Sequence, residues 1–240
     1  MIKNFIKAIV PNSYIQKIQE FKNLKARQKP KLSYSQAGED LIIDMWLGFL
    51  NIEKPTYIDI GAYDPFLLSN SALFYSKGGR GINIEPNPIL FKRFKQFRSL
   101  DVNLNVGVAA KNAILSYYIM DNDTLNSFSK EEAESCVQKG IATIKKTIQI
   151  NVLTVNEIIK TYHQNKFPDV LSLDVEGLDE DILQSIDFQN SFPKIICTET
   201  QNYSKGHREE NIINLLQEQG YFIAADTGIN TIFIRESLFK

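Results

Sequence analysis

Tyr57-Ile58-Asp59-Ile60-Gly61-Ala62-Tyr63-Asp64-Pro65 is the stretch around which the rest of this 240-residue sequence can be arranged. Its first four residues read as a short buried strand. Gly61 then allows a turn in which the backbone can approach a ligand without a Cβ atom in the way. Ligands of α/β sheets bind outside the carboxyl ends of the strands, where the strand order reverses. The stretch therefore predicts a strand, a turn and a helix that open onto a nucleotide-binding crevice.

Strands and helices alternate along the chain around this stretch. The predicted strands are residues 57–60, 82–85, 102–109, 113–120, 147–153, 170–174, 195–198, 221–225 and 231–235. The main predicted helices between them are residues 88–97, 155–164, 179–185 and 208–219. This alternation indicates an α/β fold with a mostly parallel, doubly wound sheet. The last two strands are expected to pair antiparallel at one edge.

A further helix is expected before the first strand, starting near Ser35 with Glu39 and Asp40 in its first turn. Acidic residues there suit the helix dipole. Apolar residues at helical spacing predict its buried face, namely Leu41, Ile42, Met45, Trp46 and Phe49.

The charge of the chain is unevenly distributed. Hydrophobic residues make up 43% and charged residues 23%, which is ordinary for a globular protein with a sizeable core. The net charge of −1 gives no general attraction to nucleic acid. Residues 1–31, however, hold eight basic side chains against Glu20 alone, a net charge of +7, which leaves −8 for the rest.

Residues 1–31 are therefore predicted to form a basic amphipathic helical arm, and residues 32–240 the main domain. Pro11 divides the arm into two helical pieces. The arm is expected to pack on the domain or on a partner subunit, which makes a homodimer possible. The alternative is that residues 1–28 lie on an anionic membrane surface.

The cysteines and the apolar runs limit the cellular setting. Cys136 and Cys197 are too far apart in sequence for a disulfide framework or a zinc pattern, and Cys197 is expected in the core. No apolar run reaches the roughly 18 residues that span a membrane. The first ten residues are too short and too interrupted by lysine for a signal peptide. A cytoplasmic location is expected.

The turn after the first strand departs from the dinucleotide-binding fingerprint. Tyr63 and Asp64-Pro65 stand where further glycines would fall, which argues against an NAD-dependent oxidoreductase. Such a bulky, acidic loop suits a ligand that carries an amino-acid tail and a positive charge. Glu85 ends the next strand, at a distance where an acidic residue accepts hydrogen bonds from ribose hydroxyls. A structural turn and a solvated strand-end glutamate are the alternatives.

Four pieces of sequence, taken in order, resemble the FkbM family of S-adenosylmethionine-dependent methyltransferases. They are Asp59-Ile60-Gly61-Ala62, Ser69-Asn70-Ser71, Asn83-Ile84-Glu85-Pro86-Asn87 and Leu173-Asp174-Val175-Glu176-Gly177. The first is shared by many methyltransferases, and the third and fourth are more specific. The resemblance covers roughly residues 35–235. It implies a class I methyltransferase fold, which is a Rossmann-like sheet of seven strands with a reversed last strand.

The resemblance also implies S-adenosyl-L-methionine as the cofactor. The implied cofactor-binding residues are Asp59, Gly61, Ala62, Asn70, Glu85, Pro86, Asn105, Val106, Asn126 and Ser127. The first three would line the methionine part, and Asn70 would cap the helix that faces it. Glu85 would hold the ribose. The usual Gly-Ala-Asn of the family reads Gly61-Ala62-Tyr63 in this chain.

The remaining motifs concern the cofactor's base and the acceptor. Residues 105–108 are expected near the adenine, and Asn126-Ser127 match a polar loop that the family places near the cofactor. The motif of nucleobase amino-methyltransferases is missing at the end of the strand predicted at residues 170–174. By resemblance, its absence argues against a nucleic-acid acceptor. The expected activity is O-methylation of a hydroxyl on a sugar, a nucleotide-linked sugar or a related metabolite of carbohydrate biosynthesis. The alternatives are a lipid or natural-product acceptor, or an inactive binding module.

Four residues at the predicted mouth are candidates for catalysis. Asp174 and Glu176 lie where the strand predicted at residues 170–174 opens into its loop, Glu199 ends the next strand, and His207 lies in the loop beyond it. A base that removes the hydroxyl proton contributes about 10²–10⁴-fold, and a histidine has a suitable pKa. His207 is the first candidate, unless it is an exposed loop residue, and Asp174 or Glu176 could replace it. The three carboxylates could also bind a divalent cation, although no metal is expected.

Overall fold

The computed structural model describes residues 16–17, 20, 31–175, 177–202 and 207–239, and at Asn202 and His207 the backbone only. The chain divides into two units, residues 1–32 and 33–240. Most of the predicted arm thus lies outside the described residues. No helix among the described residues is long and apolar enough to cross a membrane.

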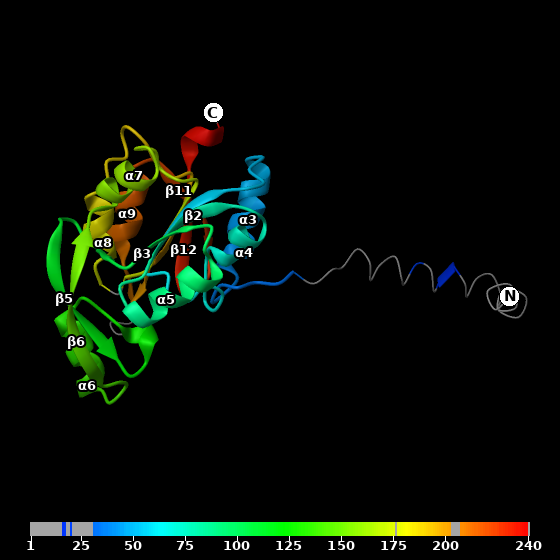
Figure 1. Ribbon diagram of the computed structural model, residues 1–240. Coiled ribbons are helices and arrows are strands. Elements are labelled where there is room, and N and C mark those ends of the chain that lie inside the picture. Colours follow the sequence, from blue (N-terminus) through cyan, green and yellow to red (C-terminus); the bar gives the residue numbers. More distant parts are fainter. Residues whose placement is uncertain (1–15, 18–19, 21–30, 176, 203–206, 240) are drawn as a thin grey trace, which may run out of the picture. The chain divides into compact units, whose positions relative to one another are not determined.

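A seven-stranded sheet forms the centre of residues 33–240 (Figure 1). From edge to edge its strands are β11 (Tyr221–Asp226), β12 (Asn230–Arg235), β8 (Ile195–Glu199), β7 (Val170–Leu173), β1 (Thr56–Ile60), β2 (Arg80–Ile84) and β3 (Val102–Leu104). The five strands from β8 to β3 are parallel, whereas β12 runs antiparallel to both of its neighbours. The predicted α/β class and the reversed strand are confirmed.

The strand order reverses beside β1. From β1 the chain moves outward to β2 and β3 in one direction, and it later returns to β7 on the other side of β1 and continues to β8. The register pairs Ile60 with Ile84 on one side and with Leu173 on the other. Gly61, Glu85 and Asp174 therefore leave the sheet next to one another, at the place where such sheets bind ligands.

Helices cover both faces of the sheet. They are α3 (Glu39–Phe49), α4 (Ala72–Ser76), α5 (Pro88–Phe97), α7 (Val155–Tyr162), α8 (Asp179–Gln184) and α9 (Glu210–Glu218). Ile58 and Ile60 pack with α7, α8 and α9, whereas Tyr57 packs with α3 and α4 on the opposite face. This follows from the alternation of side chains along a strand. Figure 1 shows α7 and α9 on one side of the sheet and α3 and α4 on the other.

The predicted buried face of α3 is wrong by part of a turn. Met45 is 47% and Phe49 67% exposed, whereas Ile43 and Leu47 are fully buried. The cause is Glu39, which is itself buried and accepts hydrogen bonds from the Asn230 side chain at 3.1 Å and from the Thr227 hydroxyl at 2.9 Å. These long-range bonds rotate the helix so that its first-turn acids face the core.

A second, smaller sheet was not predicted. Its strands, in order, are β4 (Gly107–Val108), β6 (Ile144–Leu153) and β5 (Ala113–Met120). The connection from β5 to β6 contains the 3₁₀ turn η1 (Asp123–Leu125) and α6 (Lys130–Gln138). The strand predicted at 102–109 is therefore two strands, because the chain leaves the main sheet after Leu104 and pairs with β6 from Gly107.

The remaining elements are short. They are β9 (Gln201–Asn202), β10 (His207–Arg208) and the 3₁₀ turn η2 (Glu236–Phe239). β9 and β10 form an antiparallel pair beyond the end of β8. Cys197 is fully buried in β8, as predicted.

Candidate functional site

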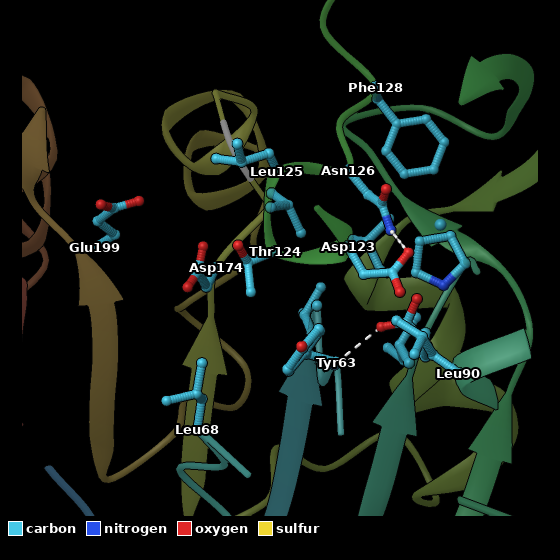
Figure 2. A pocket seen from close by; sticks show the side chains of 18 of the residues that line it. Tyr63, Leu68, Leu90, Asp123, Thr124, Leu125, Asn126, Phe128, Asp174 and Glu199 are labelled. Atoms are coloured by element: carbon cyan, nitrogen blue, oxygen red, sulfur yellow. Dashed lines mark hydrogen bonds between the residues drawn. The ribbon is translucent and has the colours of Figure 1, made fainter. Parts of the chain in front are cut away.

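A pocket of about 360 Å³ opens at the carboxyl ends of β1, β2 and β7, a volume within the range of small-molecule sites. One wall comes from the main sheet and includes Gly61, Glu85 and Asp174. The facing wall comes from the smaller sheet and η1, and it includes Asp123 and Phe128. Figure 2 shows Asp174 and Glu199 on one side of Tyr63, and Asp123, Asn126 and Phe128 on the other.

Gly61 makes the junction of the main sheet possible. Its φ of 78° is one that side chains rarely adopt, and an added Cβ atom would collide with the backbone carbonyl of Asp174. The amides of Gly61 and Ala62 both donate to the Ile84 carbonyl, at 3.1 and 3.0 Å. The turn thus joins the ends of three strands with no side chain between the backbone and the pocket.

Glu85 is held by two backbone amides. The Tyr63 amide donates to one carboxylate oxygen at 2.9 Å (Figure 2). The Asn87 amide donates to the other oxygen at 2.7 Å. The residue is only 4% exposed, and burial raises its pKa to about 8 despite these two bonds. The charges of Asp123 and Asp59 contribute to this rise in the pKa of Glu85. The carboxyl group of Glu85 therefore has a fixed position in the pocket wall. Its oxygens can still accept further hydrogen bonds from a ligand.

Asp59 faces away from the pocket, into a buried polar network. The Ser71 hydroxyl donates to Asp59, and the fully buried Arg98 donates to Ser71 Oγ at 2.9 Å. Arg98 also donates to the Tyr57 hydroxyl at 2.8 Å and to Asp101 at 3.0 Å. Burial raises the pKa of Asp59, while Ser71 and Arg98 lower it. The strand alternation therefore directs Asp59 toward Ser71 and Arg98, and Asp59 is not among the residues that line the pocket.

The other half of the pocket holds Asp174 and Glu199, with no described residue donating a hydrogen bond to either carboxylate. Burial raises the pKa of Asp174, and the charges of Asp59 and Glu39 add to this effect. The pKa of Glu199 is also raised by burial, and then by the charges of Asp174 and Asp179. Carboxyl groups with raised pKa values in a pocket are candidates for acid–base roles, and no basic residue is among the described residues that line this pocket.

Six of the predicted site residues line this pocket. They are Gly61, Glu85, Pro86, Asn126, Asp174 and Glu199. The Asn126 side chain is fixed, since its oxygen accepts from the Met120 amide at 2.8 Å and its nitrogen donates to Asp123 at 3.5 Å.

Six others do not line it, namely Asp59, Ala62, Asn70, Asn105, Val106 and Ser127. Asn70 does not cap α4, because Ser71 holds the N-cap position and Asn70 donates instead to Ser172 Oγ at 3.2 Å. Asn105 donates to the carbonyl oxygens of Glu85 and Pro86 and so fixes the turn from behind.

The last two of these residues are held by packing and backbone pairing. Val106 is partly buried and packs against the main core cluster. Ser127 is 2% exposed, and its backbone pairs with Tyr118 on β5.

Two predicted catalytic groups cannot be placed. Glu176 lies outside the described residues, and His207 is described by its backbone alone, as part of β10. Among the described parts of the chain, no group of three His, Cys, Asp or Glu residues is arranged to hold a metal ion.

Sequence reasoning missed Tyr63, Tyr117, Asp123 and Phe128, which all line the pocket. Tyr117 and Phe128 have ring centroids 4.6 Å apart. Phe128 lies against Gly107, where an added Cβ atom would overlap with its ring. The adjoining pair Asn126-Ser127 was among the predicted site residues. Which residues next to this pair face the pocket depends on the pairing of Ser127 with Tyr118 of β5.

The sequence of residues 59–223 matches the model of the methyltransferase FkbM domain. That match covers more than half of the chain and includes the pocket residues from Gly61 to Glu199. Among curated proteins, none is significantly similar to this chain.

Several solved structures are similar at low sequence identity. A putative caffeoyl-CoA O-methyltransferase from Staphylococcus aureus has a TM-score of 0.45 and 11% identity, with 97% of each chain covered. A TehB-like SAM-dependent methyltransferase from Corynebacterium glutamicum has a TM-score of 0.43 and 11% identity over 95% of this chain and 100% of that one. A precorrin-6y C5,15-methyltransferase from Geobacter metallireducens has a TM-score of 0.39 and 13% identity over 85% and 90%.

Proposed function

The chain belongs to the FkbM methyltransferase family, and we propose that it methylates a hydroxyl group of an uncharged, sugar-type acceptor. Its cofactor is S-adenosyl-L-methionine. The proposal concerns which acceptor is used and which residues of the chain carry out the transfer.

The residues of the pocket fit this cofactor. Gly61 leaves space where any side chain would collide, and Glu85 presents a fixed carboxylate that two ribose hydroxyls can share. Among the described residues that line the pocket, four carry a carboxyl group and none is basic: Glu85, Asp123, Asp174 and Glu199. S-adenosylmethionine supplies an electrophilic methyl group on a positively charged sulfur, and the carboxyl groups that are ionised favour such a cation.

Asp174 is the proposed general base. Its raised pKa makes it a better proton acceptor than an ordinary aspartate, and it ionises as the pH rises through that pKa. It faces the pocket from the end of β7, with no competing hydrogen bond from a described residue (Figure 2). In this role it takes the acceptor's hydroxyl proton during transfer.

Glu199 is proposed to keep a proton at neutral pH. Its pKa is raised by burial and by several acidic neighbours, among them Asp174 and Glu132. Two carboxyl groups whose environments separate their pKa values can act as base and hydrogen-bond donor in one site. A protonated Glu199 would donate to the acceptor and orient its hydroxyl, and such positioning is worth up to about 7–11 kcal/mol in favourable cases.

The charges of the pocket bear on the class of acceptor. No basic residue lies among the described residues that line it, so these residues offer a phosphate group carboxyl groups and no cation. This favours a neutral hydroxyl compound. A nucleotide-linked sugar fits only if its phosphates stay outside the pocket.

The observation that carries the proposal is the pair of carboxylates with raised pKa values opposite Glu85. The test is incubation of the full-length chain with cofactor labelled in its methyl group and a panel of neutral glycosides, nucleotide-linked sugars and amines. Mass spectrometry should find the label on a hydroxyl oxygen of a neutral glycoside. Label on nitrogen alone, or transfer to hydroxyls that persists unchanged in Asp174→Asn, contradicts the proposal.

A further inference from the structure

Helix α5 exposes a stripe of apolar and basic side chains. Ile89, Lys92, Arg93 and Phe97 recur at a spacing that places them on one face of the helix. Ile89 is 72% and Phe97 46% exposed, and both cations are exposed as well. The opposite face is buried, and α5 contains no acidic residue. Nothing within the described part of the chain covers this stripe.

The loop after Gly61 extends the same surface. The ring of Phe66 lies 6.2 Å from that of Phe97, and the next residue, Leu67, is 58% exposed. The loop is held in this position because Asp64 accepts hydrogen bonds from the Phe66 and Leu67 amides, at 3.0 and 2.9 Å. Asp64 also forms an ion pair with Arg93 of α5. Apolar side chains are thus held in solvent by a fixed backbone.

This surface borders the pocket. Leu68, which follows Leu67 directly, lines the pocket, and Leu90 of α5 does so as well. A partner bound along α5 and the loop would therefore lie beside residues that form the pocket wall.

The charge of the surface differs from that of the rest of the domain. Residues 32–240 carry a net charge of −8, yet Lys92, Arg93 and Lys95 lie on α5 without an acidic neighbour in the helix. Tyr34 lies beside the loop, since the Ser69 amide donates to the Tyr34 carbonyl at 2.9 Å.

We propose that this surface docks on an anionic lipid membrane. The α5 surface is defined here by Phe66, Leu67, Ile89, Lys92, Lys95 and Phe97. Exposed aromatic and aliphatic side chains flanked by lysines are what an interfacial membrane site requires, because the apolar groups insert between headgroups that the lysines attract. A second copy of the chain is a poorer partner, because a two-fold contact would bring the lysines together.

Flotation of the full-length chain with vesicles tests this inference. The vesicles consist of phosphatidylcholine alone or of phosphatidylcholine with phosphatidylglycerol. Lys92→Glu/Lys95→Glu removes the charge, and Phe66→Ser/Leu67→Ser removes the apolar contact. The matched controls are Lys146→Glu/Lys160→Glu and Ile114→Ser/Ile141→Ser, which change exposed residues on other elements. Cofactor affinity, measured by calorimetry, reports whether each variant is folded.

The wild-type chain should float only with the anionic vesicles, and less so at high salt. Each α5-surface variant should bind the anionic vesicles about tenfold more weakly or worse, with unchanged cofactor affinity, and the controls should resemble the wild type. Absence of wild-type binding overturns the inference. Equal vesicle binding by all variants also overturns it, because the contact would then belong to residues 1–31. A dimer that forms without lipid and dissociates in the α5-surface variants overturns it as well.

Discussion

The two halves of the pocket hold the same chemical group in opposite ways. On the β2 side, each oxygen of Glu85 accepts a backbone amide, from Tyr63 and from Asn87. On the β7 and β8 side, no described residue donates to the carboxylates of Asp174 and Glu199, which instead face other acids. Burial raises the pKa in both halves, but only the first half fixes its carboxylate in place.

The difference separates binding from chemistry. A carboxylate held by backbone donors has one orientation and is suited to recognise a fixed pair of hydroxyls. A carboxylate surrounded by like charges holds its proton more tightly and can exchange it near neutral pH. Four substitutions can break or sharpen this comparison.

Gly61→Ala should have the largest effect, because it disrupts the junction that joins both halves. The added methyl group would collide with the Asp174 carbonyl at a positive φ, at a cost of about 3 kcal/mol or more in unfolding free energy. Cofactor binding should be lost. Denaturant unfolding and calorimetry measure both effects. The matched control is Gly140→Ala, where φ is also positive but the Cβ atom meets open space, and a loss of equal size there would show backbone strain alone.

Asp174→Asn should lower turnover by about 10²–10⁴-fold, because the amide cannot take the hydroxyl proton. Cofactor affinity should change by less than about threefold, since Glu85 is untouched. Single-turnover kinetics and calorimetry separate the two effects. Turnover at the wild-type rate would remove Asp174 from the chemistry.

Glu85→Ala should weaken cofactor binding by about tenfold or more, because it removes hydrogen bonds to a charged acceptor. Since burial raises the pKa of Glu85 to about 8, the free protein is largely protonated there at pH 7. Ribose donors favour the ionised form, so the cofactor should bind with release of a proton and more tightly as the pH rises through 8. Calorimetry in two buffers of different ionisation enthalpy measures the proton release on cofactor binding. Glu85→Ala should abolish this release. The control Glu131→Ala, at an exposed residue, should retain it.

Glu199→Gln should have the smallest effect, a change in the shape of the pH profile. The raised pKa of Glu199 means that it is protonated below that pKa and ionises above it, placing a second charge beside Asp174. Wild-type turnover should therefore fall on the alkaline side. Glutamine is always neutral and keeps a donor, so the variant should retain activity at neutral pH and lose the alkaline fall. A profile identical to the wild type would place the titrating group elsewhere.

The parts of the fold that were predicted depend on local pattern. Short apolar runs between helical stretches predicted the main sheet, and Gly61 and Glu85 could be read from their spacing. The smaller sheet was not recognised, although β5 and β6 were predicted as strands. Nothing in residues 102–109 indicates that the chain leaves one sheet after Leu104 and enters another at Gly107.

The directions in which side chains point were harder to predict from the sequence than the helices and strands. Asp59 was predicted in the pocket, but the alternation along β1 turns it toward Ser71 and Arg98. Asn70, Asn105 and Ser127 were likewise predicted at the site, yet their hydrogen bonds and backbone pairing hold them behind the residues that line the pocket.

The sequence by itself determined the alternating elements, the reversed final strand, the glycine turn and the acidic residue two dozen positions later. These depend on hydrophobic periodicity and on backbone freedom, which act over a few residues. Only the tertiary structure decided which carboxylates share a pocket and which are supported by backbone amides. It also decided that cations and apolar side chains meet on α5, next to residues that line the pocket. Those properties come from contacts between residues far apart in the chain, where burial and neighbouring charges set the chemistry of each group.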